Sequence, residues 1–443
     1  MAKSFPKGGI HPVEYKFSAG MAIETLPLPK TVTIPVSQHI GSPAVPVVNK
    51  GDKVKVGTLI AKSSGFISVN IHSSVSGTVS KIEEITDASG YRKKSVIIDV
   101  EGDEWESSID RSSVVDKQVN YDSEEIIKKV AESGIVGMGG ATFPTHVKLA
   151  IPKGKKAEVL IINGAECEPY LTADHRLMLE RGNEIIVGIK ILMKALKTDK
   201  TLFGIESNKP DAINTMNRLA ANSLGIDIVP LKVQYPQGGE KQLIKALIGR
   251  EVPSGGLPID VGTVVHNVGT TLAVYEAIQK NKPLIERVVT ITGKNVRQPG
   301  NFLVRIGTPV SVLIEAIGGL PDDTGKIVSG GPMMGKALGS IDIPVTKGTS
   351  GILLLSKKDA VRAEMLNCIR CGNCVSVCPM GLEPYLFMQF SERSMWERME
   401  QSKALDCIEC GSCSFSCPSK RTLLDYIKLG KANIIRIKRE KQK

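Results

Sequence analysis

Short runs of alternating apolar and polar residues fill the first quarter of the chain. From Thr31 they include "TVTIPV", "GTLIAKS", "GTVSKIEEI" and "SVIIDVEG", with turn residues between them. Alternation with a period of two is typical of strands with one buried face. It predicts a compact β domain over 31–102. The Pro- and Gly-rich residues before it, 1–30, are expected to wrap around another domain.

The hydrophobic period changes after residue 120. The stretch "SEEIIKKVAESG" has helical spacing with Ser123 as a plausible N-cap, and the buried strand "AEVLIING" follows it. Helical and strand patterns then alternate, which is typical of a parallel sheet covered by helices. We expect an α/β domain over 120–283, joined to the β domain by an acidic linker at 103–119.

Strand patterns return from Leu284, where "ERVVTITG" and "KIVSGGPMMG" flank one helix, "PVSVLIEAIG". This arrangement predicts a small β-grasp-like module over 284–350. A cysteine-rich domain is expected at 351–430, with helical residues between its two cysteine groups. For the basic tail, 431–443, we favour a solvated terminus. The fold class is therefore multidomain, combining α/β and β parts.

Length and composition support several globular domains. The 443 residues exceed what one core holds, and 42% of them are apolar. No apolar run reaches the roughly 20 residues of a membrane helix, and the N-terminus has no apolar signal region. The net charge of +11 is largely diffuse. Without an RNP-type or zinc-finger motif, nucleic-acid binding is a remote alternative.

Eight of the nine cysteines form two motifs of the form C-x2-C-x2-C-x3-C-P. Thiolates suit the iron of a cubane cluster, and three ligands at this spacing wrap one cluster while the fourth reaches the other. We therefore predict two crossed [4Fe-4S] sites. One set is Cys368, Cys371, Cys374 and Cys417, and the other is Cys407, Cys410, Cys413 and Cys378. Structural zinc is the alternative, but its cysteine pairs are usually separated by a longer gap.

A glycine-rich loop, "GIVGMGGATFPTHVKL", follows the first helix of the α/β domain. Bare glycine amides, a helix starting near Pro144 and the ammonium of Lys148 together predict an anion site. The next strand ends in "INGAECEPY", and ligands bind at the carboxyl ends of parallel strands. On this pattern alone, a plain turn remains the alternative to a binding loop.

Two resemblances extend these inferences. "GDKVKVGTLIA" and "SSVSGTVSKI" resemble the barrel-sandwich fold of lipoyl and biotinyl domains, although Phe66 and its neighbours stand where a carrier lysine would be. The glycine loop, "INGAECEPY", "YPQGGEKQLIKAL" and "VVHNVGTTLA" occur in the order seen in the NADH-oxidising, flavin-binding subunit of respiratory complex I. Together with "FPKGGIHPVE", "SGGPMMG" and the cysteine motifs, they make the chain similar to the C subunit of the Rnf complex over nearly its whole length.

The complex I resemblance implies binding residues position by position. It implies FMN contacts at Gly137, Gly139, Gly140, Lys148, Asn163, Glu166, Glu168, Tyr235, Gly238, Gly239, Glu240, Asn267 and Thr270. It implies NADH contacts at Gly140, Ala141, Phe143, Lys148 and Glu168. The sequence departs from that family at Met138, Ala165, Cys167, His266 and Gly269, where complex I has arginine, aspartate, serine, asparagine and glutamate.

The Rnf resemblance implies a peripheral NADH-oxidising subunit of an ion-translocating ferredoxin:NAD oxidoreductase. Hydride would pass from NADH to FMN, and single electrons would pass through two [4Fe-4S] clusters, with no side chain acting as acid or base. The implied partners are the membrane subunits and the ferredoxin-like B subunit, at the cytoplasmic face of the cell membrane. The alternatives are a cobalamin reductase of diol-utilising microcompartments, or an electron-carrying scaffold without a nucleotide site.

Overall fold

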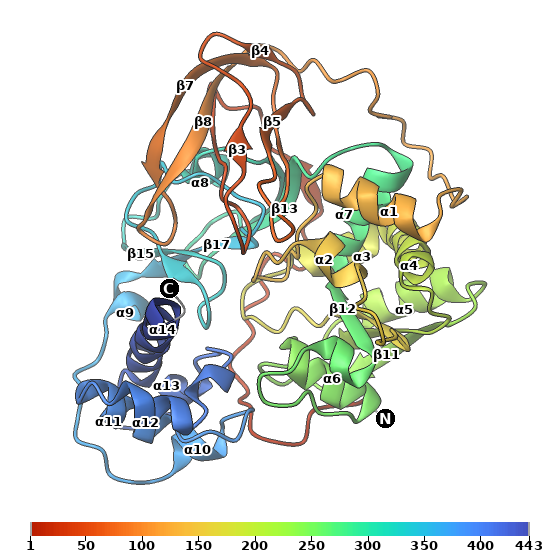
Figure 1. Ribbon diagram of the computed structural model, residues 1–443. Helices are drawn as coiled ribbons and strands as arrows, with labels where there is room; N and C mark the ends of the chain where they lie inside the picture. Colours follow the sequence, from red (N-terminus) through yellow and green to blue (C-terminus); the bar gives the residue numbers. More distant parts are fainter. Residues whose placement is uncertain (1, 442–443) are drawn as a thin grey trace.

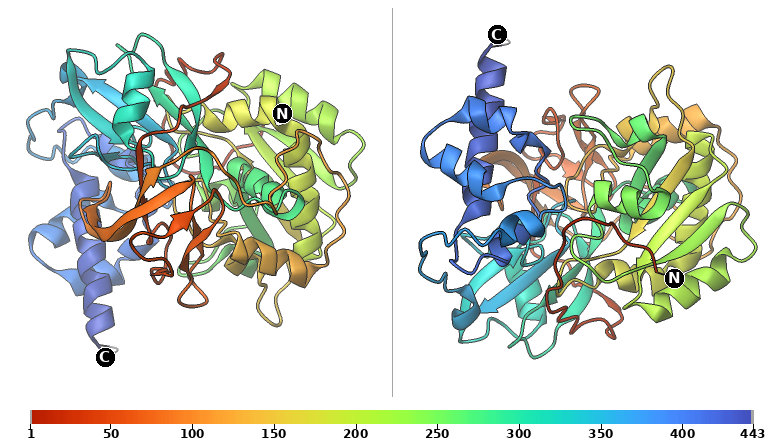
Figure 2. Two further views of the ribbon diagram at one scale, coloured as in Figure 1. Left: turned by 90° about the horizontal axis from the view of Figure 1, so that it is seen from above. Right: turned by 90° about the horizontal axis from the view of Figure 1, so that it is seen from below.

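The computed structural model describes residues 2–441. A β domain, an α/β domain, a mixed sheet and a helical cysteine-rich domain lie side by side (Figure 1). The N-terminal segment does not belong to one of them. It runs from the α/β domain across to the other parts, as the view from below shows in dark red (Figure 2).

Two small sheets make up the β domain. Alternate residues of its strands, such as Val32, Ile34 and Ile98, are fully buried between the sheets, as the period-two pattern predicts. The first sheet has the order β2 (Thr31–Pro35), β8 (Arg92–Val100), β7 (Gly77–Thr86), β4 (Lys53–Val54). The second has the order β3 (Val45–Pro46), β5 (Leu59–Lys62), β6 (Ile71–His72).

The α/β domain contains a four-stranded parallel sheet, which confirms the predicted architecture. Its order is β11 (Ile226–Leu231), β10 (Thr201–Glu206), β9 (Val159–Gly164), β12 (Thr263–Asn267). The chain order reverses at β9, so the carboxyl ends of β9 and β12 form the switch point where ligands bind in such sheets.

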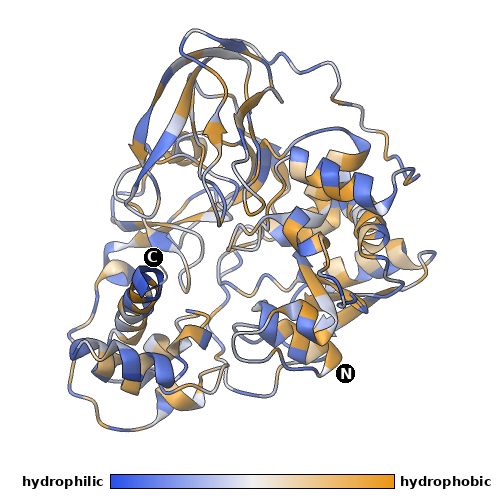
Figure 3. Cartoon of the chain, viewed as in Figure 1, coloured by the Kyte–Doolittle hydropathy of each residue, from blue (hydrophilic) through white to orange (hydrophobic). Residues whose placement is uncertain are grey.

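Helices cover this sheet, and apolar residues run along α4 in Figure 3. The helices are α1 (Ser123–Glu132), α2 (Thr145–Leu149), α3 (Ala173–Glu180), α4 (Gly182–Leu196), α5 (Pro210–Ala220), α6 (Glu240–Ile248), η1 (Pro258–Val261) and α7 (Val268–Gln279). The predicted N-cap Ser123 is wrong by one residue. Asp122 caps α1 in a capping box with Glu125, while the Ser123 hydroxyl donates to the Ala195 carbonyl.

The third part is a six-stranded mixed sheet. Its order is β1 (Ile23–Thr25), β14 (Gly300–Arg305), β13 (Glu286–Thr292), β17 (Gly351–Ser356), β15 (Thr324–Ser329), β16 (Lys336–Ala337), with α8 (Val310–Ala316) beside it. The predicted limit at residue 350 is therefore wrong, because β17 is an interior strand of this sheet. Its apolar residues are buried and its backbone pairs on both edges.

The cysteine-rich domain is helical, as predicted. It contains α9 (Lys357–Ala360), α10 (Asn373–Ser376), α11 (Pro384–Glu392), α12 (Trp396–Gln401), η2 (Ala404–Asp406), α13 (Ser412–Phe415) and α14 (Leu423–Lys441). The tail after residue 430 is helical as far as residue 441, because α14 continues through it; most of its residues are exposed, as expected, but Ile434 is buried. None of the helices within 2–441 is long and apolar enough to cross a membrane.

Candidate functional site

The glycine loop closes on itself above the switch point. Gly137 N donates to the Phe143 carbonyl at 2.9 Å, and Thr142 N donates to the Gly137 carbonyl at 3.1 Å. A Cβ on Gly139 would lie 3.3 Å from the Asn267 Cβ, so the loop passes close to the end of β12. Gly140 has φ +125°, and nothing lies within 4 Å of a Cβ there. The loop therefore presents exposed, unobstructed backbone to the crevice.

Lys148 projects from α2 to the same edge of the sheet. Its Nζ donates to Glu240 Oε1 at 2.6 Å and to the Val265 carbonyl at 3.1 Å. Glu240 is the first residue of α6, whose N-cap Gly239 has no side chain to satisfy the helix amides. An ammonium thus lies beside the uncapped N-terminus of α6, which is a suitable environment for a phosphate.

Two loops of the sheet edge are joined by side chains. Asn163 Nδ2 donates to the Gly238 carbonyl at 2.9 Å, and Gly238 N donates to Cys167 Sγ at 3.3 Å. A Cβ on Gly238 would stand 3.2 Å from that sulfur, so the glycine permits the close approach. Burial raises the pKa of the Cys167 thiol, which keeps it protonated.

Glu166 serves as a helix cap. Its two carboxylate oxygens accept from Asp174 N at 2.8 Å and His175 N at 3.1 Å, in the first turn of α3. Asp174 itself accepts from Asn267 Nδ2 at 2.6 Å, and burial, followed by the charge of Glu166, raises its pKa to about 7. The sequence patterns did not single out Asp174, which links two predicted FMN residues.

Glu168 faces the mixed sheet. Its oxygens accept from Met333 N at 3.1 Å and Met334 N at 2.8 Å, in the loop after β15. A Cβ on Gly331 would stand 2.2 Å from Glu168 Oε2, which explains a glycine at that position. Burial raises the pKa of Glu168 to about 7, while the two amides lower it. The "SGGPMMG" stretch is thus a docking loop for a carboxylate of "INGAECEPY", the predicted flavin-binding segment, called the flavin loop from here on.

The two predicted cysteine sets differ in exposure. Cys378, Cys407, Cys410 and Cys413, the buried quartet from here on, line one cavity together. Burial raises the pKa of Cys407 to about 11 and of Cys413 to about 12, and the four sulfur atoms around one cavity are soft donors of the kind that iron-sulfur clusters take. The donor set therefore fits a metal cluster.

The second set, the exposed quartet, consists of Cys368, Cys371, Cys374 and Cys417. Cys368 and Cys371 are exposed, and the other two are half-buried. Burial raises the pKa of the Cys374 thiol, and the nearby Cys417 and Cys368 raise it further. Among residues 2–441, no three His, Cys, Asp or Glu side chains have the geometry of a single-ion site.

Tyr235 connects the crevice at the sheet edge, the predicted flavin crevice, to the buried quartet. It is 2% exposed, and its Oη donates to the Cys410 carbonyl at 2.8 Å. It packs in a small apolar cluster that contains Ile10 and Cys410, with Cys167 and Met333 against it. A residue of the predicted FMN set therefore touches a predicted cluster ligand.

Family models match four segments of the chain. They are the RnfC barrel sandwich hybrid domain at 4–103, the Nuo51 FMN-binding domain at 130–276, the SLBB domain at 288–337 and the 4Fe-4S dicluster domain at 367–422. Their order confirms the predicted fold class. The FMN-binding match favours a flavin site over a scaffold without one.

Full-length relatives decide the family. The chain is 47% identical to the C subunit of the Na(+)-translocating ferredoxin:NAD(+) oxidoreductase complex of Acetobacterium woodii, over 98% of both chains. It is 48% identical to the C subunit of the proton-translocating complex of Clostridium ljungdahlii, over 90% of this chain and 87% of that one. This chain belongs to the RnfC family. It is a C subunit of an ion-translocating ferredoxin:NAD oxidoreductase, with an FMN-binding domain and a 4Fe-4S dicluster domain.

A solved structure shares the fold. The NAD+-reducing [NiFe]-hydrogenase in the H2-reduced state superposes with a TM-score of 0.51 at 18% identity, over 71% of this chain and 63% of the hydrogenase chain. At this identity the likeness concerns the architecture alone.

Two departures of this RnfC chain from complex I are neighbours in space. A Cβ on Gly269 would lie 3.0 Å from Met138 Cε, and Met138 is buried. The positions that hold an arginine and a glutamate in complex I thus form an apolar contact here. Ala165 is buried and its amide donates to Asn163 Oδ1 at 3.1 Å, so the loop keeps a polar link without a carboxylate. His266 is buried, and burial lowers its pKa to about 3.

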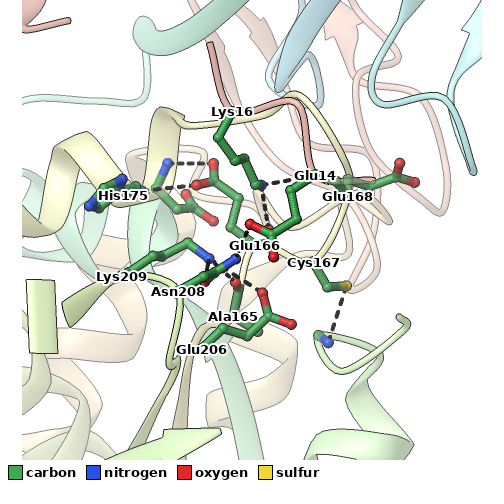
Figure 4. Close-up of polar contacts among 12 residues, drawn as sticks. Glu14, Lys16, Ala165, Glu166, Cys167, Glu168, His175, Glu206, Asn208 and Lys209 are labelled. Carbon is green, nitrogen blue, oxygen red and sulfur yellow. Dashed lines mark hydrogen bonds and ion pairs between the residues drawn. The ribbon is translucent and has the colours of Figure 1, made fainter. Parts of the chain in front are cut away.

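Two lysines that contact the flavin loop, the buried Lys209 and the half-buried Lys16, were missed by the sequence patterns (Figure 4). Lys209 Nζ donates to the Ala165 carbonyl at 2.8 Å and pairs with Glu206 at 3.3 Å. Lys16, from the N-terminal segment, donates to three carbonyls of the loop that begins at Glu166. Neither lysine lies in a motif, and no local signal could have placed them there.

Proposed function

We propose that this RnfC chain oxidises NADH at FMN and passes single electrons through two [4Fe-4S] clusters to other subunits of its complex, in a reversible exchange between NAD and ferredoxin. The observation that carries the proposal is the hydrogen bond from Tyr235 Oη to the Cys410 carbonyl. It brings the flavin crevice and the buried quartet into direct contact.

The proposed FMN site lies at the carboxyl edge of the parallel sheet. Lys148 and the uncapped start of α6 suit the phosphate, and the exposed glycine backbone leaves room for a planar ring. Glu166, Asn267 and Thr270 support this crevice through hydrogen bonds to the backbone. The FMN-contacting set is Gly137, Gly139, Gly140, Lys148, Asn163, Glu166, Glu168, Tyr235, Gly238, Gly239, Glu240, Asn267 and Thr270.

NADH would approach from the open side of the glycine loop. Gly140 and Ala141 are exposed there, and the half-buried Phe143 follows them. These three residues, with Lys148 and Glu168, form the proposed NADH contacts. The Glu168 carboxylate is held by two backbone amides, so this part of the crevice is fixed in place.

When bound, FMN converts a two-electron hydride donor into a source of single electrons, and [4Fe-4S] clusters carry single electrons. The side chains of this chain bind and orient, and none is required as a general acid or base. We assign the buried quartet to the cluster nearer the flavin. The exposure of Cys368 and Cys371 supports a position for the other cluster at the surface, where a partner can approach.

Membership of the RnfC family supports the proposed partners and location. As a C subunit without a membrane-spanning helix within 2–441, the chain would dock on the membrane subunits at the cytoplasmic face. The ferredoxin-like B subunit is the proposed electron partner at the exposed quartet. This docking is part of the proposal.

Flavin and iron analysis of anaerobically prepared protein, with an NADH:viologen assay, tests the proposal. We expect bound FMN, two [4Fe-4S] clusters and NADH-dependent viologen reduction. Replacing Lys148 by Ala should weaken FMN binding roughly 10- to 100-fold, the equivalent of one charge-assisted hydrogen bond. The matched control is Lys153→Ala, an exposed lysine just after α2. Protein that binds no FMN and reduces no viologen would contradict the proposal.

A further inference from the structure

Residues 3–18, the strap from here on, cross the carboxyl edge of the α/β sheet. Lys3 N donates to the Pro230 carbonyl at 2.9 Å, at the end of β11. Ile10 and Tyr235 then exchange both backbone hydrogen bonds, at 2.9 and 2.8 Å. The strap is thereby fastened to the residue whose hydroxyl binds the Cys410 carbonyl.

The strap also touches the cysteine-rich domain. Gly9 N donates to the Val377 carbonyl at 2.9 Å, next to Cys378 of the buried quartet. A Cβ on Gly8 would stand 2.6 Å from the Cys378 carbonyl carbon and oxygen, and Gly8 has φ +70°. Only glycine combines that backbone conformation with so close an approach.

Six residues after Ile10, the strap contacts the flavin loop through Lys16. Lys16 Nζ donates to the carbonyls of Glu166 and Glu168 at 2.9 Å each, and to that of Leu171 at 2.6 Å (Figure 4). Tyr170 N donates to the Glu14 carbonyl at 2.8 Å. All three donor positions of the ammonium are occupied by backbone oxygens, so Lys16 acts as a clamp on this loop.

Between these anchors the strap does not pack continuously on the sheet. A cavity of about 210 Å³ lies between the anchors, lined by strap residues on one side and by the end of β10, the segment after β11 and the flavin loop on the other. Glu206 lines it, with one buried carboxylate oxygen that has no hydrogen-bond partner. The strap is therefore held at Gly8–Ile10 and at Lys16, and between them by hydrogen bonds that include those from His11 to the Val233 carbonyl and from Asn208 to the Glu14 carboxylate.

We propose that the strap is a positioning element that sets the spacing between the flavin loop and the buried quartet. This inference rests on the proposed function. A single segment grips both partners of an electron transfer, and the rate of such a transfer falls steeply with distance. The strap residues form no bond with the substrate; they hold the two sites at one separation.

The test uses the full-length, cofactor-loaded protein and the substitution Gly8→Ala. The added methyl group must push the strap away from Cys378. Gly20→Ala is the matched control, because it lies just beyond the strap and nothing is within 4 Å of its Cβ position. After rapid mixing with NADH, we expect flavin reduction at the wild-type rate and cluster reduction at least about tenfold slower. The control should match wild type in both.

Lys16→Met tests the other anchor. We expect about tenfold weaker FMN binding with unchanged iron content, since loss of the clamp loosens only the flavin loop. Partial recovery in Lys16→Arg would agree with a clamp, and the exposed Lys30 offers a neutral control as Lys30→Met.

Two results would overturn the inference. One is cluster reduction at the wild-type rate in Gly8→Ala. The other is loss of iron from that variant, since Gly8 would then serve cluster assembly and not spacing. Failure of the proposed function is distinguishable, because NADH would then leave the flavin of the wild-type protein oxidised.

Discussion

The two cysteine quartets each take three ligands from a motif of the same spacing, but their surroundings differ. The buried quartet lies in an apolar core with Phe387, Leu423 and Ile427, and its neighbours reach it from the strap and the α/β domain. The exposed quartet has two ligands in contact with solvent. The motif determines which cysteines can share a cluster, while distant segments of the chain determine which cluster is enclosed.

One difference lies within the motifs themselves. Arg370 of "CIRCGNC" is exposed, whereas Glu409 at the matching position of "CIECGSC" binds Lys431 at 2.6 Å. Lys431 also donates to the Cys407 carbonyl at 2.7 Å. The buried quartet therefore has a fixed cation beside it, placed there by α14.

The largest expected effect is a difference in protein stability between a cysteine substitution in the buried quartet and one in the exposed quartet. Cys413→Ser and Cys371→Ser should each lose about half of the iron. Cys413→Ser should also destabilise the protein by about 2 kcal/mol more than Cys371→Ser does, because it leaves a polar group in an apolar core. Iron analysis and anaerobic thermal unfolding would measure both. Equal destabilisation by the two substitutions would refute the difference in burial.

Glu168 offers a pH test of its contact with the "SGGPMMG" loop, whose Met333 packs against the small apolar cluster that contains Cys410. Its pKa is raised from 4.5 to about 7, so the folded state binds more protons than the unfolded state between these values. The stability of wild type relative to Glu168→Gln should therefore fall as the pH rises towards 7, by roughly 1–3 kcal/mol. Chemical unfolding at several pH values checks this. A constant difference between the two proteins would argue against a buried carboxylate.

Replacing Lys431 should change the reduction potential of the cluster in the buried quartet and leave that of the other cluster unchanged. Lys431→Met is expected to lower the potential of the buried cluster by about 60 mV, since a charge-assisted hydrogen bond is worth roughly 1.4 kcal/mol and a one-electron couple shifts 59 mV per factor of ten. Redox titration followed by EPR would show it, with Lys428→Met on the same helix as the control. A shift in the reduction potential of the exposed cluster alone would contradict the assignment of Lys431 to the buried cluster.

The smallest effect concerns two tyrosines. Tyr235→Phe removes the bond to the Cys410 carbonyl and should cost about 1 kcal/mol, while Tyr385→Phe removes an exposed bond to Glu383 and should cost little. The EPR signal of the buried cluster should change in the first variant only. Equal losses of stability and equal EPR changes in the two variants would show that the hydrogen bond to the Cys410 carbonyl contributes no more than the exposed one.

Local patterns predicted much of the fold. Alternating elements at 120–283 produced the parallel sheet, and period-two runs produced the β domain. Two predicted domain boundaries, at residues 350 and 430, were misplaced because they depend on contacts between segments far apart in the chain. The strand β17 joins a sheet whose other strands begin at Ile23, and α14 continues because Ile434 finds an apolar partner surface.

Sequence patterns predicted less of the candidate site than of the fold. Spacing indicated which cysteines could be grouped, and the glycine loop indicated an anion site. The roles of Lys16, Lys209 and Asp174 depend on contacts between segments far apart in the chain, which no linear spacing encodes. Glu166 was expected at the flavin hydroxyls, and the structure shows its carboxylate capping α3.

The central claim is that the buried quartet holds the cluster next to the flavin. The most direct test mixes NADH rapidly with Cys371→Ser and with Cys413→Ser, and follows the remaining cluster by freeze-quench EPR. The account predicts that the cluster remaining in Cys371→Ser is reduced at the wild-type rate, and that the one remaining in Cys413→Ser is reduced at least about tenfold more slowly. The opposite order would contradict it.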